Sequence, residues 1–292
     1  MSKSKPSVDL SQRFLFEKKH IRGELIRIQQ TLKDLLKHHD YNPVEKRLLA
    51  QVICVACMMS SMLKVKGKFS IQLQSASNLK LLLVQVSNQE QLRALLQSDS
   101  PLETDDLLAI ARGGHMLVSL YTETMRDPYQ TIIPIHHHDL VGCIEHYFLQ
   151  SEQLKTRLWL KDDGETFAGF LLQALPEMDE ASFWDEAVMF CETVEDKELL
   201  GLPFDQLVFR LFHEQDDVRL FDATPLQFHC GCSREKMRNA VMVMPTDEVQ
   251  QILEEDGQMS LRCDFCHQYY TFMADDLAED VAGDGLGSQK LH

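Results

Sequence analysis

The chain has 292 residues, of which 44% are hydrophobic and 25% are charged, and its formal net charge is −16. This length holds one large domain and a smaller one, and the composition is ordinary for a globular protein. The most apolar stretch, Leu48 to Leu63, is broken by polar residues and is too short to span a membrane, so we expect a buried helix and no membrane partner.

The N-terminus lacks the apolar core of a secretion signal, because Met1 to Pro6 leads directly into polar sequence. Eight cysteines without such a signal indicate a reducing compartment, in which thiols bind metals or sense redox state. We therefore expect a cytoplasmic protein.

Residues 1–176 are expected to form a mixed α/β domain. Strands are predicted over residues 21–28, 69–74, 79–86, 115–121, 129–135, 157–161 and 167–175. Helices are predicted over residues 31–37, 43–64 and 89–97, and from the cap Asp139 to about Gln153. Asn42 is the expected N-cap of the long helix, with Pro43 in its first position. Since strands and helices alternate without a regular βαβ period, we expect an α+β fold with a mixed or antiparallel sheet and packed helices.

Residues 177–229 form an acidic segment with 3 basic and 14 acidic side chains, whereas the chain before it carries a net charge of +2. Helices are expected over about 182–194 and from near Pro203. An apolar stripe at spacing i, i+3, i+4, i+7 and i+8 consists of Phe204, Leu207, Val208, Leu211 and Phe212. This stripe predicts a helix that docks on the preceding domain. The docking is either permanent or conditional, because a self-repelling segment is released by a small change in free energy.

Four cysteines near the C-terminus form two close pairs, a C-x-C at Cys230 and Cys232 and a C-x-x-C at Cys263 and Cys266. Two such pairs supply the four thiolates of one tetrahedral zinc ion when the intervening fold brings them together. We therefore predict Zn²⁺ bound by these four residues. Buried thiols, or paired disulfides without a metal, are the alternative.

Residues 230–292 are expected to form a small module with a net charge of −7. Ser233 and Thr246 are predicted to cap two helices, and residues 261–263 and 267–272 to form a hairpin with the C-x-x-C at its tip. Because the module has few large apolar side chains, zinc, which contributes ~10–16 kcal/mol to such modules, should decide whether it folds. Its negative charge argues against nucleic-acid binding.

Four zinc-bound thiolates stay deprotonated at neutral pH, which is the form that oxidants attack. Oxidation to disulfides removes the ligands and releases the ion. The site is therefore either purely structural, as most four-thiolate sites are, or a redox switch.

Motifs along the whole chain resemble the redox-regulated heat-shock protein 33 family of zinc-dependent holdases. The C-terminal signature is C-G-C-S-R-E-K from Cys230 and C-D-F-C from Cys263. Further similar motifs are R-F-L-F-E from Arg13, R-G-E-L from Arg22, Y-F-L-Q-S-E-Q from Tyr147, L-Q-A-L-P from Leu172 and R-L-F-H-E from Arg210. They occur in the family's order and cover nearly the whole chain.

The resemblance implies an ATP-independent chaperone rather than an enzyme, inactive while reduced and zinc-bound. It implies a core domain (1–176), a metastable linker (177–229) and a redox-switch domain (230–292). On oxidation, Cys230 would pair with Cys232 and Cys263 with Cys266, zinc would be released, and the linker would unfold. The exposed surfaces would then hold unfolding client proteins, and the oxidised protein would form a homodimer.

The other cysteines and several histidines are not expected to bind a metal or to take part in redox chemistry. Cys54 and Cys57 fall on one apolar face of the predicted 43–64 helix, so buried inert thiols are favoured over a redox pair. Two further cysteines, Cys143 and Cys191, are expected in helix cores. The run His136, His137 and His138 is interpreted as a solvated loop rather than a metal site. The flanking His229 and His267 are interpreted as exposed neighbours of the cysteines, rather than as groups that support the ligands or replace an oxidised thiol.

Two other classes of function stay open. A thiol-disulfide oxidoreductase needs an acidic C-x-x-C at the start of a helix, whereas Cys54 falls in mid-helix and Cys263 on a hairpin. A zinc-ribbon module that binds nucleic acid needs clustered basic residues, which the −7 module lacks.

Overall fold

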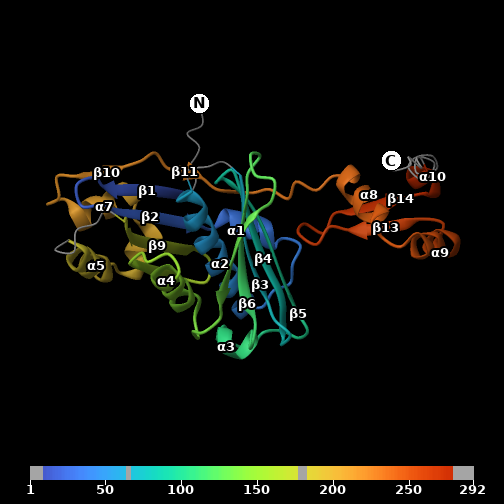
Figure 1. Cartoon of the computed structure of the whole chain (residues 1–292), viewed down its shortest axis with the longest axis horizontal. Coiled ribbons are helices and arrows are strands. Elements are labelled where there is room, and N and C mark those ends of the chain that lie inside the picture. The colour runs from blue at the N-terminus through green and yellow to red at the C-terminus, as the bar shows by residue number, and fades with distance from the viewer. Residues whose placement is uncertain (1–8, 64–66, 177–182, 279–292) are drawn as a thin grey trace, which may run out of the picture. The chain divides into compact units, whose positions relative to one another are not determined.

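The structure is a computed structural model that describes residues 9–63, 67–176 and 183–278 (Figure 1). The chain separates into two compact units, Met1–His229 and Cys230–His292. The described residues form an α+β fold, as predicted, and contain ten helices. The acidic segment is part of the first unit, and the division into three domains stays a prediction.

The first sheet of unit 1 is antiparallel throughout, in the order β10-β1-β2-β9-β8, with β11 also pairing with β1. Its strands are β1 (Leu10–Phe16), β2 (Ile21–Ile28), β8 (Thr156–Asp162), β9 (Phe167–Ala174), β10 (Val218–Leu220) and β11 (Thr224–Pro225). All eight residues of β9 are buried, because helices cover both faces of the sheet. This explains why β9 is a nearly continuous apolar run rather than an alternating one.

The second sheet of unit 1 has the order β12-β5-β4-β3-β6-β7. Its strands are β3 (Lys68–Gln74), β4 (Leu79–Ser87), β5 (Gln91–Ser98), β6 (His115–Tyr121), β7 (Tyr129–Pro134) and β12 (Gln227–Phe228). Among the described strands of this sheet, β12 and β5 pair in parallel and the other neighbours are antiparallel. The acidic segment therefore contributes strands to both sheets.

The long helix α2 (Pro43–Ser61) packs against strands of both sheets, and its buried residues form the main core with them. Asn42 caps it as predicted: its side chain accepts hydrogen bonds from the amides of Val44 and Glu45, while Glu45 accepts one from the Asn42 amide. The shorter helices before the acidic segment are α1 (Gln30–Leu36), α3 (Leu107–Ile110) and α4 (Leu140–Gln150), the last capped by Asp139.

The acidic segment covers the outer face of the first sheet with α5 (Trp184–Glu192), α6 (Asp196–Gly201) and α7 (Phe204–Phe212) (Figure 1). All five residues of the predicted stripe on α7 are buried. Phe212 stacks edge-on against Phe16, and Phe14 lies over Gly23, where a Cβ would be 2.0 Å from the Phe14 ring. Docking of the stripe is confirmed.

Several carboxylates of the acidic segment pair with cations of the sequence before it. Asp217 pairs with Lys19, Asp196 with Lys161 and Glu192 with Arg157. Arg27, buried in β2, donates hydrogen bonds to the Leu199 and Leu202 carbonyls, and its guanidinium lies 4.7 Å from the Phe204 ring centroid. These contacts offset part of the self-repulsion that a net charge of −11 imposes.

Unit 2 consists of α8 (Arg234–Met242), α9 (Thr246–Asp256), α10 (Ala274–Ala278) and the antiparallel hairpin β13 (Met259–Arg262) and β14 (Tyr269–Phe272). Among the described residues of unit 2, the buried apolar side chains outside the cysteines are Val241, Met259, Phe272 and Leu277. So small a core supports the expectation that a ligand contributes much of the folding free energy.

Some predicted elements differ from the structure. Most of residues 89–97, predicted as a helix, belong to the strand β5 (Gln91–Ser98), because Leu92, Ala94 and Leu96 alternate into the core and β4 supplies the hydrogen bonds. Thr246 is not a cap but the first residue of α9, whose N-cap is Pro245. The glycine-rich tail from Ala282 to His292, for which the sequence predicts disorder, lies outside the described residues.

Candidate metal centre

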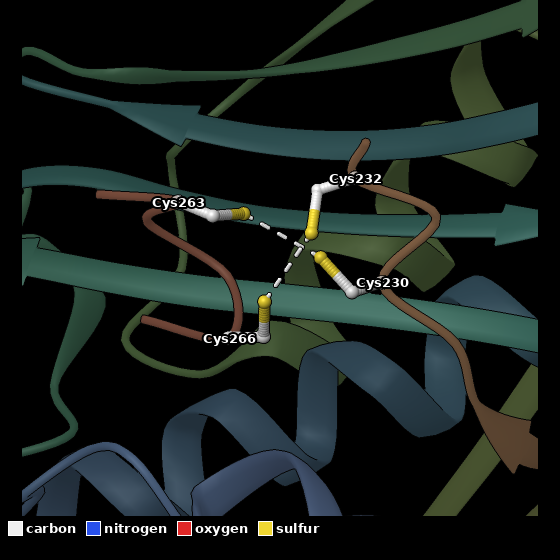
Figure 2. Close-up of side chains that lie close together, drawn as sticks. All are labelled: Cys230, Cys232, Cys263 and Cys266. Carbon is white, nitrogen blue, oxygen red and sulfur yellow. Dashed lines mark hydrogen bonds between the residues drawn. The ribbon is translucent and has the colours of Figure 1, made fainter. Parts of the chain in front are cut away.

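The four cysteines of the two predicted pairs come together in unit 2. One sulfur from each of Cys230, Cys232, Cys263 and Cys266 lies within 4.8 Å of all the others, and Figure 2 shows the four side chains pointing toward one centre. The Sγ atoms of Cys230 and Cys263 lie 3.5 Å apart, and so do those of Cys232 and Cys266. Each contact links one predicted pair to the other, so neither pair is a separate site.

Two turns present these sulfurs. Cys230 and Cys232 flank Gly231, whose φ of +62° lies in the left-handed region that glycine adopts readily. Cys263 and Cys266 lie on the turn between β13 and β14, which is closed by a 2.8 Å hydrogen bond from the His267 amide to the Cys263 carbonyl. This turn also ends with a residue in the left-handed backbone conformation, which here is His267 with a φ of +56°.

The arrangement fits a zinc ion. A tetrahedral site with Zn–S bonds of about 2.3 Å places its sulfurs about 3.8 Å apart, which is close to the 3.5 Å contacts. All eight cysteines are free thiols, so the four here retain their ligand atoms. An all-sulfur donor set is soft, which favours zinc over calcium or magnesium.

Residues of the C-G-C-S-R-E-K motif connect this site to the rest of unit 2 through hydrogen bonds and an ion pair. Ser233 caps α8 as predicted, accepting a hydrogen bond from the Lys236 amide. Arg234 donates to the Thr271 carbonyl at 2.7 Å and pairs with Asp276, so it joins α8 to the strand after the C-x-x-C. The Lys236 ammonium donates to the Gly231 carbonyl at 2.6 Å, which places a positive charge beside thiolates that would carry a net −2 with zinc.

The thiols of the cluster differ in acidity. Burial raises the pKa of Cys230 and, less strongly, that of Cys266. Burial opposes ionisation of Cys232 too, but hydrogen bonds from Tyr270 and from the other thiols outweigh it, and the pKa of Cys232 lies below its ordinary value. Of these three thiols, Cys232 is therefore the most readily ionised.

The remaining cysteines lie outside the cluster and are buried, as predicted: Cys54 and Cys57 in α2, Cys143 in α4 and Cys191 in α5. Burial raises the pKa of every one of these four thiols, which makes them poor nucleophiles.

The histidines do not join the cluster within the described part of the chain. The run at 136–138 lies in the loop before α4, where His138 Nδ1 lies 2.8 Å from Asp106 Oδ2. Of the flanking residues, His229 is exposed and His267 is half-buried.

Residue spacing did not identify Tyr270 as part of the site. Its hydroxyl lies 3.1 Å from Cys232 Sγ. The available signal was the alternation of β14, which places Tyr270 on the same face as the buried Phe272, two residues along.

The helices of the described residues include no segment with the length and apolarity of a membrane span.

Comparisons with known proteins agree on one family. The Hsp33 protein family profile matches residues 9–273. The 33 kDa chaperonin of Serratia proteamaculans is 35% identical, over 97% of this chain and 99% of that protein. The 33 kDa chaperonin of Salmonella typhi is 36% identical, over 94% and 95%. Among solved structures, the 33 kDa chaperonin of Thermotoga maritima has a TM-score of 0.78 over 92% of this chain and 96% of its own, at 17% identity, which supports the fold.

Proposed function

Because this chain belongs to the Hsp33 family, we propose that it is a redox-regulated, ATP-independent chaperone that binds unfolding proteins after oxidation of Cys230, Cys232, Cys263 and Cys266. A chaperone function is supported by the family. The redox control is our proposal, and it is supported by two features: the cluster of four sulfurs in unit 2, and the buried apolar surface of unit 1 that the docked acidic segment covers.

In the reduced protein these four cysteines would hold zinc, which supplies the folding free energy that the small core of unit 2 lacks. Oxidation would join Cys230 to Cys232 and Cys263 to Cys266. Each disulfide removes two thiolates, so both together leave no ligand for the ion. Since structural zinc contributes ~10–16 kcal/mol, which is as large as the whole net stability of a typical domain, unit 2 should then unfold.

The acidic segment is the element that unfolding of unit 2 would release. His229, which directly precedes Cys230, donates its amide hydrogen to the Leu92 carbonyl at 2.9 Å and so continues the pairing of β12 with β5. Strands of two or three residues, as β10, β11 and β12 are, hold the segment by few hydrogen bonds. Unfolding that begins at Cys230 would therefore first reach β12, one of the short strands through which the acidic segment is held by few hydrogen bonds.

Release of the acidic segment would expose apolar surface on the segment itself and on the sheet that it covers. The segment contributes Phe204, Leu207 and Phe212, and the sheet beneath contributes Phe14, Phe16 and other buried residues. A surface of this kind binds unfolded chains without sequence preference, and a second oxidised copy is a further partner. We place this activity in the cytoplasm, where the cysteines are reduced until stress oxidises them.

The test uses zinc-loaded protein treated with peroxide under mild heat. Zinc release, helix content and suppression of aggregation of an unfolding client are followed together. We expect all three to change in parallel, and reduction with dithiothreitol plus zinc to restore the inactive state. Zinc loss without any gain in anti-aggregation activity would refute the proposed function.

A thiol-disulfide oxidoreductase is less well supported, because Cys54 and Cys57 are buried and their pKa values are raised. Turnover of a disulfide substrate would favour it over a chaperone. Nucleic-acid binding by unit 2 would appear as a salt-dependent gel shift.

A further inference from the structure

The hydroxyl of Tyr270 contacts the cluster: Tyr270 Oη lies 3.1 Å from Cys232 Sγ. Tyr270 pairs with Leu261 across the hairpin, and its ring packs against the small core of unit 2. The preceding Tyr269 is 63% exposed, because successive residues of a strand face opposite sides. The core therefore holds the Tyr270 ring while the hydroxyl reaches the cysteines.

With a metal ion bound, Cys232 is a thiolate and has no proton to donate, so Tyr270 must be the donor of this hydrogen bond. A hydrogen bond donated to a thiolate withdraws electron density from the sulfur and weakens it as a nucleophile. We propose that Tyr270 is a positioning residue for the redox switch, whose hydroxyl retains Cys232 as a ligand and protects its sulfur from oxidation. This inference rests on the proposed redox function.

The chemistry of disulfide formation shows at which stage the hydrogen bond from Tyr270 would protect Cys232. A thiolate attacks a peroxide oxygen, the O–O bond breaks, hydroxide leaves and a sulfenic acid remains on sulfur. A neighbouring thiolate then attacks the sulfenic sulfur, the S–O bond breaks, a second hydroxide leaves and a disulfide forms. Two electrons pass from the two sulfurs to the peroxide. Because Tyr270 donates a hydrogen bond to its sulfur, Cys232 should react more slowly with peroxide. It should therefore be the second thiolate, which attacks the sulfenic acid, rather than the first, which attacks the peroxide.

The variant Tyr270→Phe keeps the ring in the core and removes only the hydroxyl. The matched control is Tyr269→Phe, which removes an exposed hydroxyl from the other face of the same strand. At a fixed peroxide concentration, zinc release should be about fivefold faster in Tyr270→Phe, the factor that corresponds to about 1 kcal/mol, and unchanged in the control. In cobalt-loaded protein, the sulfur-to-cobalt charge-transfer bands should shift in Tyr270→Phe alone.

Equal rates and unshifted bands in Tyr270→Phe would overturn the inference. A measurement on the unaltered protein covers the case in which the variant does not fold. Dimedone, which traps sulfenic acids, should label Cys232 less than Cys266 at a low peroxide concentration. Stronger labelling of Cys232 would refute the protection. These outcomes are separate from the proposed function, which fails only if zinc loss brings no anti-aggregation activity.

Discussion

Lys19 Nζ lies 2.6 Å from Asp217 Oδ1, and the Asp217 side chain is 1% exposed. The other oxygen of the carboxylate accepts a hydrogen bond from the Lys18 amide at 3.0 Å. One buried carboxylate therefore ties the acidic segment, just before β10, to the turn between β1 and β2. The neighbouring pair of Lys18 and Asp216 is exposed, with side-chain exposures of 68% and 79%.

Asp217→Asn should loosen the acidic segment, because it removes the charge that holds Lys19 and the Lys18 amide. We expect a loss of about 2 kcal/mol in the free energy of unfolding, the typical contribution of hydrogen bonds to a charged group. Limited proteolysis of the reduced, zinc-loaded protein should cut the segment faster. Asp216→Asn is the control and should leave stability almost unchanged, since exposed pairs contribute little. Equal effects of the two variants would contradict the role given to Asp217.

Phe212→Ala should release the docked helix α7. Phe212 is 2% exposed and contacts Phe14 and Phe16, whereas Phe209 on the same helix is 70% exposed. Truncating a buried phenylalanine costs about 3–5 kcal/mol, so Phe212→Ala should need less oxidant to suppress client aggregation. Phe209→Ala should behave as the unaltered protein does. A Phe212→Ala protein with an unchanged oxidant requirement would show that α7 does not restrain activity.

Glu24 should make the stability of the first unit fall with rising pH. Its carboxyl is buried beside α2, and burial raises its pKa to about 7 despite hydrogen bonds from Ser11 and Ser61 and the charges of Arg13 and Arg22. An unfolded glutamate titrates near 4.5, so between about pH 4.5 and 7 the folded state binds a proton that the unfolded state lacks. The stability present below pH 4.5 is therefore lost as the pH rises through 7.

Glu24→Gln removes this titration while keeping an acceptor for Ser11. We expect the variant to exceed the unaltered protein in unfolding free energy by on the order of 3 kcal/mol at pH 8, and by little near pH 4.5. Urea unfolding of both proteins across this range measures the difference. A difference independent of pH would show that Glu24 does not titrate as the burial of its carboxyl implies.

His267→Gly should strengthen metal binding in unit 2. His267 has φ +56°, a left-handed conformation that costs an L-residue roughly 1 kcal/mol more than glycine. The full gain would make the variant lose zinc to a chelator about fivefold less readily, and the greater freedom of an unfolded glycine reduces this factor. His267→Ala keeps the backbone cost and removes the imidazole, so it separates the two effects. A gain shared by both variants would assign the effect to the side chain.

The candidate site could be predicted from sequence because its ligands carry their own signal. Cysteines in two close pairs have few roles in proteins. The spacing of Cys230, Cys232, Cys263 and Cys266 therefore indicates a metal site with four thiolate ligands. Tyr270 carried no such signal, because a tyrosine in a strand is common, and only the register of the hairpin places its hydroxyl at Cys232.

The fold was predictable where local chemistry decides it. The cap at Asn42 and the stripe on α7 are local features, and both are confirmed. Long-range pairing was not predictable: β10 and β11 are two or three residues long and join β1 from some 200 positions away. In β5, good helix formers such as Gln91 and Leu95 form a strand because the neighbouring strand supplies their hydrogen bonds.

The central claim is that the four cysteines control whether the acidic segment stays docked. Hydrogen exchange read by mass spectrometry tests it most directly, with zinc-loaded protein compared before and after peroxide. We predict that backbone amides of 184–228 lose protection as zinc is released, while those of β2 and β9 keep most of theirs. Full protection of 184–228 after complete zinc release and disulfide formation would contradict the account.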